Sequence, residues 1–354
     1  MQIEEKYMRR CINLARNGVG FVSPNPMVGA VVVCDDKIIG EGYHAKCGEA
    51  HAEVNAIASV RDKELLKRST IYVSLEPCSH HGKTPPCAEL IIKMQIPRVV
   101  VGSKDPFPQV AGRGIAMLRA AGIEVVEDVL KNECDELNKT FMHCHTAKRP
   151  FVFLKWAQTA DGYMDYKRTS EDRKKPLILS NEESRREVHK LRSEFDAIMV
   201  GTTTALLDNP SLTVRYWSGR NPIRIVLDQN LDLPKDLHLF DGGVTTLVVN
   251  EIKNGKDGPG LEYIKMDFSL NLHSQLLAEL QRRKIESLMV EGGCILLQSF
   301  IDEQLWDEAR VEYAPFCIGN GVPAPMLNGV MKEVETIKSN RIVHYSLKEG
   351  YKIL

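Results

Sequence analysis

The feature that most restricts how this chain can fold is a set of three candidate metal ligands from two separate segments. His51 opens the run His51-Ala52-Glu53, whereas Cys78 follows Pro77 and Cys87 closes the polar loop of residues 79–86. One imidazole and two thiolates supply three positions of a tetrahedral zinc ion and leave the fourth open for water, as a catalytic zinc site requires. The fold must therefore bring His51 close to both cysteines.

Glu53 is the natural proton carrier beside such a site. Zinc-dependent base deaminases carry the pattern H-x-E followed by P-C-x-x-C, in which the glutamate is not a metal ligand. The order of residues here is the same, although the gap between Cys78 and Cys87 is longer. The competing interpretation is a buried histidine with two unrelated core cysteines. Cys47 is a rival ligand, but a fourth protein ligand would close the site.

The length of 354 residues predicts two domains, and we expect them to span residues 1–147 and 148–354. The boundary is placed where a mixed polar stretch ends and Pro150 precedes an apolar run. His143 and His145 flank a cysteine in that stretch, but no further ligand stands at a suitable spacing for a metal site.

Charge and composition narrow the functional class. With 46 basic and 47 acidic residues the formal net charge is −1, which argues against a general nucleic-acid or membrane-surface binder and favours a small substrate. The amino-terminal residues lack the apolar core of a signal peptide, and no apolar run is long enough to span a membrane. Nine cysteines without framework spacing suit a reducing compartment, so we expect a cytoplasmic protein.

Hydrophobic periodicity in the first half predicts alternating strands and helices. An amphipathic helix over 4–17 precedes strands at 28–33, 37–44, 70–75, 98–102 and 123–126, with helices beginning near residues 51, 87 and 112 and a last one over 128–144. This alternation implies a sheet with helices on both faces.

The first half resembles a known family, the bifunctional riboflavin-biosynthesis deaminase/reductases. The resemblance rests on N-P-M-V-G-A-V-V from Asn25, on His51-Ala52-Glu53, on L-E-P-C from Leu75 with its long insert, and on D-P-x-P-x-V-x-G-x-G from Asp105. It implies a cytidine-deaminase-like three-layer α/β sandwich and an aminopyrimidine substrate with a ribose phosphate. By this resemblance the polar residues around the substrate are Asn25, His44, His80, Lys83 and Asp105.

The second half again alternates strands, predicted at 151–157, 197–204, 223–228, 245–250 and 287–293, with a helix over 294–301. Lys155 stands in an otherwise apolar strand, an expensive placement unless its ammonium reaches a cleft or a partner. Two glycines precede the helix at Cys294, where backbone N–H groups can hold a phosphate. Because no G-x-G-x-x-G pattern occurs, a Rossmann-type cofactor site is disfavoured.

This half resembles the reductase domain of the same family, on K-W-A-x-x-x-D-G from Lys155, V-G-x-x-T from Val200, D-N-P-x-L-x-V-R from Asp208 and V-E-G-G from Val290. The resemblance implies a dihydrofolate-reductase-like α/β fold that uses NADPH. The implied cofactor contacts are Ala157, Thr204, Asp208, Gly293, Cys294, Ile295, Leu296, Leu297, Gln298 and Ser299. The implied substrate contacts are Arg192, Leu212, Arg215 and Glu291. Many relatives carry a tryptophan within the stretch that corresponds to residues 165–180, and this chain has none there.

The resemblance predicts that zinc and Glu53 serve a deaminase acting on 2,5-diamino-6-ribosylamino-pyrimidinone 5′-phosphate. In the second domain NADPH would then reduce the ribosyl group to a ribityl chain, with Lys155 and Asp208 as candidate polarising or proton-donating groups. Two alternatives stay open: a zinc deaminase for free or tRNA-bound nucleosides, and a regulatory protein with an inactive deaminase fold. No nucleic acid or membrane partner is expected, and the sequence is compatible with a homo-oligomer.

Overall fold

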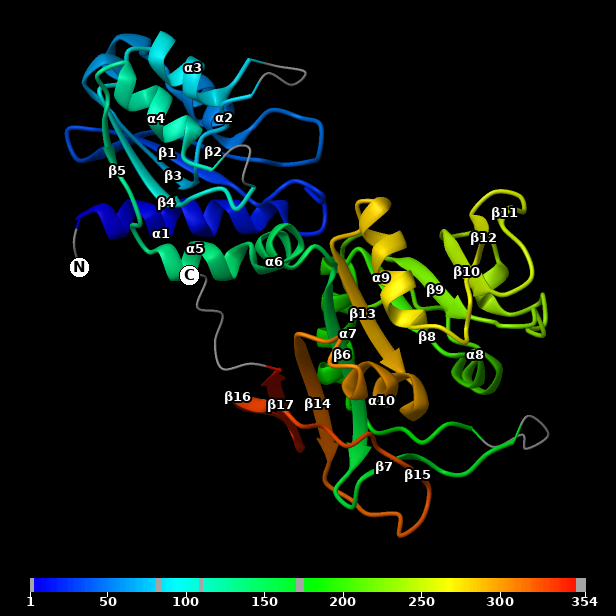
Figure 1. The fold of residues 1–354 in the computed structure, drawn as a ribbon. Helices are drawn as coiled ribbons and strands as arrows, with labels where there is room; N and C mark the ends of the chain where they lie inside the picture. The colour runs from blue at the N-terminus through cyan, green and yellow to red at the C-terminus, as the bar shows by residue number, and fades with distance from the viewer. Residues whose placement is uncertain (1–2, 81–84, 108–110, 170–174, 348–354) are drawn as a thin grey trace. The chain divides into compact units, whose positions relative to one another are not determined.

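The computed structural model describes residues 3–80, 85–107, 111–169 and 175–347 (Figure 1). The chain divides into two compact units, Met1–Lys148 and Arg149–Leu354. No helix within these described ranges is long and apolar enough to cross a membrane.

The first unit is built on a five-stranded sheet in the order β2-β1-β3-β4-β5. β1 pairs antiparallel with β2 and β3, whereas β3, β4 and β5 run parallel. The strands are β1 (Gly29–Cys34), β2 (Lys37–Tyr43), β3 (Thr70–Leu75), β4 (Arg98–Ser103) and β5 (Glu124–Val126). The helices are α1 (Ile3–Ala15), η1 (Arg16–Gly18), α2 (Ala52–Ser59), η2 (Lys63–Arg68), α3 (Cys87–Lys93), α4 (Arg113–Ala120), α5 (Lys131–Leu137) and α6 (Lys139–Ala147).

Helices cover both faces of this sheet because its central strands are apolar on both sides. α1 and α5 pack on one face, against Val31, Tyr72 and Val100. α2, α3 and α4 pack on the other, against the alternate residues of the same strands. Figure 1 shows the three layers, with α1 and α5 on one side of the strands and α2 to α4 on the other.

The helix predicted over 128–144 is wrong in one respect, because it is divided at Asn138 into α5 and α6. The Asn138 side chain exchanges two hydrogen bonds with the backbone of Met27, one at 2.8 Å and one at 2.9 Å. An asparagine that bonds a distant backbone in this way favours a break over a continuous helix.

The second unit contains a ten-stranded sheet in the order β11-β12-β10-β9-β8-β13-β6-β14-β17-β16, and β7 pairs with β15 in a separate small sheet. The strands from β12 to β14 in this order are parallel, and β17, β16 and β11 join antiparallel at the edges. Its strands are β6 (Phe151–Thr159), β7 (Tyr163–Asp165), β8 (Ala197–Val200), β9 (Ile223–Leu227), β10 (Thr246–Asn250), β11 (Gly255–Lys256), β12 (Leu261–Lys265), β13 (Ser287–Gly292), β14 (Glu308–Ala314), β15 (Val322–Pro323), β16 (Val330–Ile337) and β17 (Asn340–Ser346). Its helices are α7 (Glu182–Glu194), α8 (Thr202–Asp208), η3 (His238–Phe240), α9 (Leu272–Arg282) and α10 (Cys294–Asp302).

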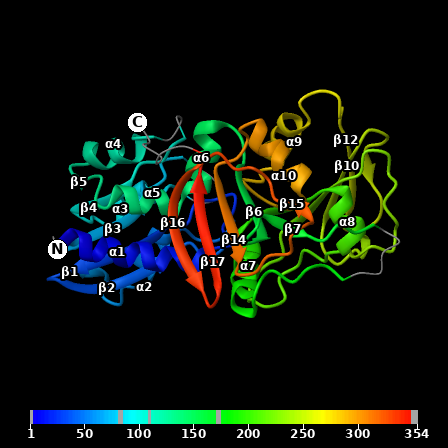
Figure 2. The same cartoon turned by 90° about the horizontal axis from the view of Figure 1, so that it is seen from below.

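The two faces of the central strands have different partners. Leu154, Trp156 and Val311 belong to the core that α9 and α10 complete. Phe151 and Phe153 belong to a second core on the opposite face, with Leu191 of α7 packed against it. Figures 1 and 2 show α7 on the side of β6 and β14 opposite α9 and α10.

The strand predicted over 197–204 is too long, because β8 ends at Val200 and α8 begins at Thr202. The fully buried run stops at Val200. Gly201 is the extended N-cap of the helix, and the Thr202 hydroxyl donates to the Leu227 carbonyl at 2.6 Å. The chain therefore leaves the strand at Gly201, and the bond from Thr202 to β9 fixes the start of the helix.

Candidate active sites

The three predicted metal ligands come together in the first unit. His51 Nδ1 lies 3.5 Å from Cys78 Sγ and 3.4 Å from Cys87 Sγ. All three ligand atoms lie within 4.8 Å of one another. Zn–N and Zn–S bonds of about 2.0 and 2.3 Å at tetrahedral angles would separate such atoms by about 3.5 to 3.8 Å. The donor set and its spacing fit a zinc ion.

Each ligand stands where an element begins or ends. His51 is the extended N-cap residue of α2, and Cys87 is the first residue of α3 after Pro86. Cys78 follows the end of β3, and its carbonyl accepts the Ala88 N–H at 3.2 Å. The Cys87 N–H also points to Cys78 Sγ at 3.3 Å. Hydrogen bonds from the backbone of α3 thus hold the two cysteines close together without an ion.

The electrostatics of the cluster favour thiolate ligands. The neighbouring Cys87 thiol and the His51 ring lower the pKa of Cys78 to about 4. The same pairing with Cys78, together with burial, raises the pKa of Cys87. The lowered pKa of Cys78 favours a thiolate at that position, and a bound cation would favour ionisation of Cys87 as well.

Glu53 lies in the first turn of α2 and is 3% exposed. Burial, followed by the charge of Cys78, raises its pKa to about 7. A carboxyl group with such a pKa can both accept and donate a proton near neutral pH.

Asn25 and His44 form a connected pair next to the metal ligands. His44 Nδ1 must donate to the Ala50 carbonyl, 3.1 Å away, so His44 Nε2 accepts from the Asn25 amide at 3.0 Å. The His44 ring also packs edge-on against His51, with 5.4 Å between centroids. His44 is 2% exposed, so it contacts the Asn25 amide and the His51 ring from the protein interior and helps to orient both.

The remaining predicted deaminase residues lie on loops. Asp105 is half-buried and accepts the Phe107 N–H at 2.8 Å. Burial raises its pKa, while the charge of exposed His80 acts in the opposite direction. Lys83 lies outside the described residues.

Glu76 is a residue that sequence reasoning missed. It is 4% exposed and lies two residues before Cys78. Its carboxylate accepts four backbone N–H groups, from Gly114 at 2.9 Å, Gly112 at 2.9 Å, Ile115 at 3.2 Å and Asp105 at 3.4 Å. It thereby joins the Cys78 turn to the start of α4 and to the Asp105 loop. The signal in the sequence was its place in the motif L-E-P-C, directly before Pro77.

Glu76→Gln should weaken zinc binding about tenfold and lower the thermal unfolding midpoint by several degrees, because the amide NH₂ would face backbone N–H groups that need an acceptor. Zinc affinity by competition with a chelator and thermal unfolding would measure both effects. Glu49→Gln, at an exposed carboxylate near His51, is the matched control. A Glu76→Gln protein with unchanged zinc affinity would contradict the role given to these four bonds.

In the second unit, charged residues gather between the sheet and α7. Arg192 Nε and Nη2 donate to the two oxygens of Glu291 at 2.9 and 2.6 Å. Although burial acts to raise the pKa of Glu291, Arg192 and then Lys155 lower it to about 2. Burial lowers the pKa of Lys155. His189 Nδ1 accepts the backbone N–H of Arg215 at 2.9 Å. This bond links the charged cluster to residues 215–218.

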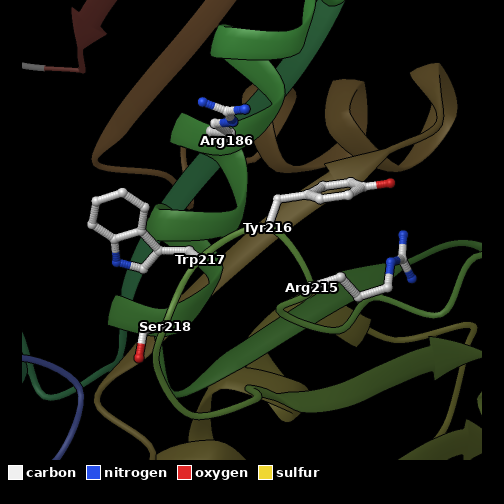
Figure 3. Close-up of a pocket in the computed structure, with 5 residues that line it drawn as sticks. All are labelled: Arg186, Arg215, Tyr216, Trp217 and Ser218. Carbon is white, nitrogen blue, oxygen red and sulfur yellow. The ribbon is translucent and has the colours of Figure 1, made fainter.

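That segment borders a hollow of 610 Å³ lined by Arg186, Arg215, Tyr216, Trp217 and Ser218. Figure 3 shows Arg186 on a helix, which is α7, and the other four residues on the loop between α8 and β9, with the Tyr216 ring between the two arginines. The ring centroids of Tyr216 and His189 lie 4.8 Å apart. Leu212, also predicted to face substrate, is 2% exposed.

The predicted cofactor residues differ in how they are placed for contact with a ligand. Thr204 stands beside the glycine turn, because a Cβ added at Gly293 would lie 3.2 Å from its hydroxyl. Gly292 has φ +144°, a conformation that L side chains rarely adopt. Along α10, however, Leu297 is fully buried in the core and Ile295 is 85% exposed. The remaining predicted contacts are Ala157 on β6 and Cys294, Leu296, Gln298 and Ser299 on α10.

Asp208 ends α8, and it pairs with Arg168 from the stretch of residues 165–180. Arg168 also donates to Asp165 at 2.7 Å and to the Leu207 carbonyl at 3.3 Å. Its guanidinium is therefore held by two carboxylates. Residues 170–174 of the same stretch lie outside the described residues.

Two family models match the chain. Residues 150–348 match the RibD C-terminal domain, and residues 1–103 match the cytidine and deoxycytidylate deaminase zinc-binding region. The two folds described above are thus a cytidine deaminase domain and a RibD-type, dihydrofolate-reductase-like domain.

Named relatives match over nearly the whole chain. The riboflavin biosynthesis protein RibD of Actinobacillus pleuropneumoniae is 41% identical over 88% of this chain and 84% of its own length. RibD of Aquifex aeolicus is 39% identical over 95% of this chain and 94% of its own length. A solved Thermotoga maritima structure, described as a diaminohydroxyphosphoribosylaminopyrimidine deaminase/5-amino-6-(5-phosphoribosylamino)uracil reductase, has a TM-score of 0.88 and 38% identity, covering 97% of this chain and 98% of that one. Acinetobacter baumannii RibD has a TM-score of 0.87 and 29% identity, with 98% and 99% coverage.

Proposed function

Since this chain belongs to the RibD family of bifunctional riboflavin-biosynthesis enzymes, we propose a substrate and a set of catalytic residues for each of its two activities. The first unit is a zinc-binding deaminase and the second a reductase. The proposed substrate of the first is 2,5-diamino-6-ribosylamino-pyrimidinone 5′-phosphate, which loses its 2-amino group by hydrolysis. The second then reduces the ribosyl group of the product to a ribityl chain with NADPH. The Thermotoga maritima relative, which carries both activities in its description, supports this order.

In the deaminase, His51, Cys78 and Cys87 would hold the ion. Zinc, when bound, lowers the pKa of a water molecule towards about 7, so that hydroxide is available at neutral pH. Glu53 takes one proton of the attacking water and passes it to the ring nitrogen. It then takes the second proton from the hydroxyl newly attached to carbon and gives it to the departing amine, which leaves as ammonia. The Asn25 amide, held by His44, orients the pyrimidine ring, and His80, Lys83 and Asp105 line the rest of the substrate site.

In the reductase, NADPH, when bound, supplies a hydride to C1 of the ring-opened sugar imine. Lys155 Nζ donates the proton that the imine nitrogen requires, and Asp208 is the second candidate for polarising this group. Arg215 and Arg186 offer two guanidinium groups to the substrate phosphate on the hollow described above, a geometry that suits bidentate binding. Arg192 positions Glu291 through its paired bonds.

The convergence of His51, Cys78 and Cys87 beside buried Glu53 carries this proposal. The same unit offers a set of metal-ligating side chains, a buried carboxyl group as proton carrier and an amide that could recognise the ring. Both cysteines must stay reduced to bind an ion, so we also propose a reducing compartment such as the cytoplasm.

The purified protein should release ammonia and then oxidise NADPH when given the same diaminopyrimidine ribose phosphate. NADPH should be turned over at least about tenfold better than NADH at low cofactor concentration, because a site that binds the 2′-phosphate gains charge-assisted hydrogen bonds. Ammonia release and absorbance of the cofactor would be followed in one reaction. Ammonia release without reduction would contradict the role of the second unit, and equal turnover of NADPH and NADH would contradict the cofactor assignment.

A further inference from the structure

Arg310 is a buried cation with an incomplete set of partners. It lies on β14, is 2% exposed and is among the largest fully buried side chains. Neither of its terminal nitrogens has a hydrogen-bond partner among the described residues. Its nearest carboxylate oxygen is that of Glu312, at 3.9 Å from Nη1. A buried charge in this state is costly, so a role in folding does not explain it.

Glu312 does not satisfy this arginine because other donors already occupy its oxygens. Ser180 donates to one oxygen at 2.7 Å. Ser184 and Asn340 donate to the other, each at 2.6 Å. The carboxylate is therefore anchored between α7 and β17, and it stays beyond hydrogen-bond distance of the guanidinium.

The neighbouring strand places Lys155 directly beside Arg310. The two residues are register partners in the parallel pair of β14 and β6, so their side chains leave the same face of the sheet. That face is the one covered by α7, since Glu312, two residues further along β14, bonds to Ser184 of α7. Strands in a sheet lie about 4.8 Å apart, so the two cations start from adjacent backbones in a buried setting.

We propose that Arg310 is a positioning residue of the reductase, which repels the Lys155 ammonium from the adjoining strand and so makes it a more effective proton donor to the substrate. This inference rests on the proposed role of Lys155. Hydride goes from NADPH to C1, and the Lys155 ammonium gives its proton to the imine nitrogen. The neutral amine is then reprotonated from water.

The carboxylates around Lys155 act on its pKa more strongly than the arginines, so Arg310 offsets part of their effect. Glu291 on β13 and Glu312 on β14 favour its ammonium form, while Arg192 on α7 and Arg310 oppose it. His189 on α7 also faces it. Glu291 is engaged by two bonds to Arg192, so Arg310 is the cation whose charge is least satisfied by a direct partner. Around Arg310 itself the remaining acidic groups are Glu335 and Glu187, and His344, its register partner on β17, bonds to Glu335 at 3.2 Å.

Arg310→Met tests this inference. Above the pKa of Lys155 the proton donor is lost, so the reductase rate should fall on the alkaline side of its pH profile. Removing the neighbouring cation should raise that pKa and shift the alkaline limb upward by about one pH unit. Reduction of 5-amino-6-(5-phosphoribosylamino)uracil by NADPH would be measured across pH. Methionine fills a similar volume, and replacing a buried ion by an apolar residue is often tolerated, so thermal unfolding should stay cooperative.

Two further variants separate charge from shape. Arg310→Lys keeps the cation, so the alkaline limb of its pH profile should stay at the wild-type position. An upward shift in Arg310→Lys equal to that in Arg310→Met would overturn the inference. Arg341→Met removes an exposed cation that lies over Tyr313, at 4.7 Å, on the opposite face of the same strands, and it should leave the limb unchanged. The inference would also be overturned if the alkaline limb of the pH profile stayed at its wild-type position in Arg310→Met.

Lys155→Met distinguishes this inference from the function on which it rests. If Lys155→Met keeps both activity and the alkaline limb, the proposed proton donor is wrong. If the limb disappears in Lys155→Met but does not move in Arg310→Met, the donor stands and the role of Arg310 fails.

Discussion

Glu53→Gln should lower the rate of ammonia release by about 10²- to 10⁴-fold, the range usual for loss of a general acid–base group. Glutamine keeps the size of the side chain but cannot accept the proton of water or return it to the amine. His51, Cys78 and Cys87 are unchanged in this variant, so zinc should remain at one ion per chain. Ammonia release at saturating substrate and elemental analysis would test both statements.

The second unit provides the internal control for this experiment. It has its own sheet and its own charged cluster, so Glu53→Gln should still oxidise NADPH when supplied with the deaminated intermediate. Conversely, Lys155→Ala or Asp208→Ala should spare ammonia release and impair only reduction. Wild-type deamination by a zinc-loaded Glu53→Gln protein would show that the assigned mechanism is wrong.

Cys78→Ser and Cys87→Ser should each lose the bound zinc. The thiolates supply two of the three protein ligands, and a neutral hydroxyl in place of a thiolate removes both a soft ligand and a negative charge. Metal content after dialysis against a weak chelator would measure the loss, which should abolish deamination as well.

Cys47→Ser is the matched control for these two variants. Cys47 is exposed, lies in the segment before His51 and was the rival ligand on sequence grounds. It is absent from the group of residues that the structure brings together for a metal, so its replacement should leave zinc content unchanged. Full zinc in both Cys78→Ser and Cys87→Ser would rule out the assigned ligand set.

The metal site and the main elements that carry it were predictable because their signals are local. His51 and Cys87 stand at helix starts and Cys78 follows an apolar strand, and these positions depend on short-range patterns that the residues themselves display. The distance between the cysteines in the sequence does not matter once the end of β3 and the start of α3 meet. The family motifs extended this information to both domains.

Other features depend on partners that are far away in the sequence. Asn138 divides a predicted helix because it bonds Met27, and Glu76 binds Gly112, Gly114 and Ile115 at the start of α4. Neither pairing follows from periodicity or spacing, since a hydrogen bond between distant residues exists only after the sheet has placed them.

The charged residues between α7 and the second sheet also depend on contacts between distant parts of the chain. In the sequence, Lys155 is an unexpected cation in an apolar strand, and no motif includes Arg310. The parallel register of β6 and β14 made them neighbours on one buried face. Which ionisable groups the chain contains, and which elements carry them, can be read from the order of its residues. Which of these groups share a low-dielectric space follows from the packed fold alone, because electrostatic coupling depends on the distance between two groups and on their burial.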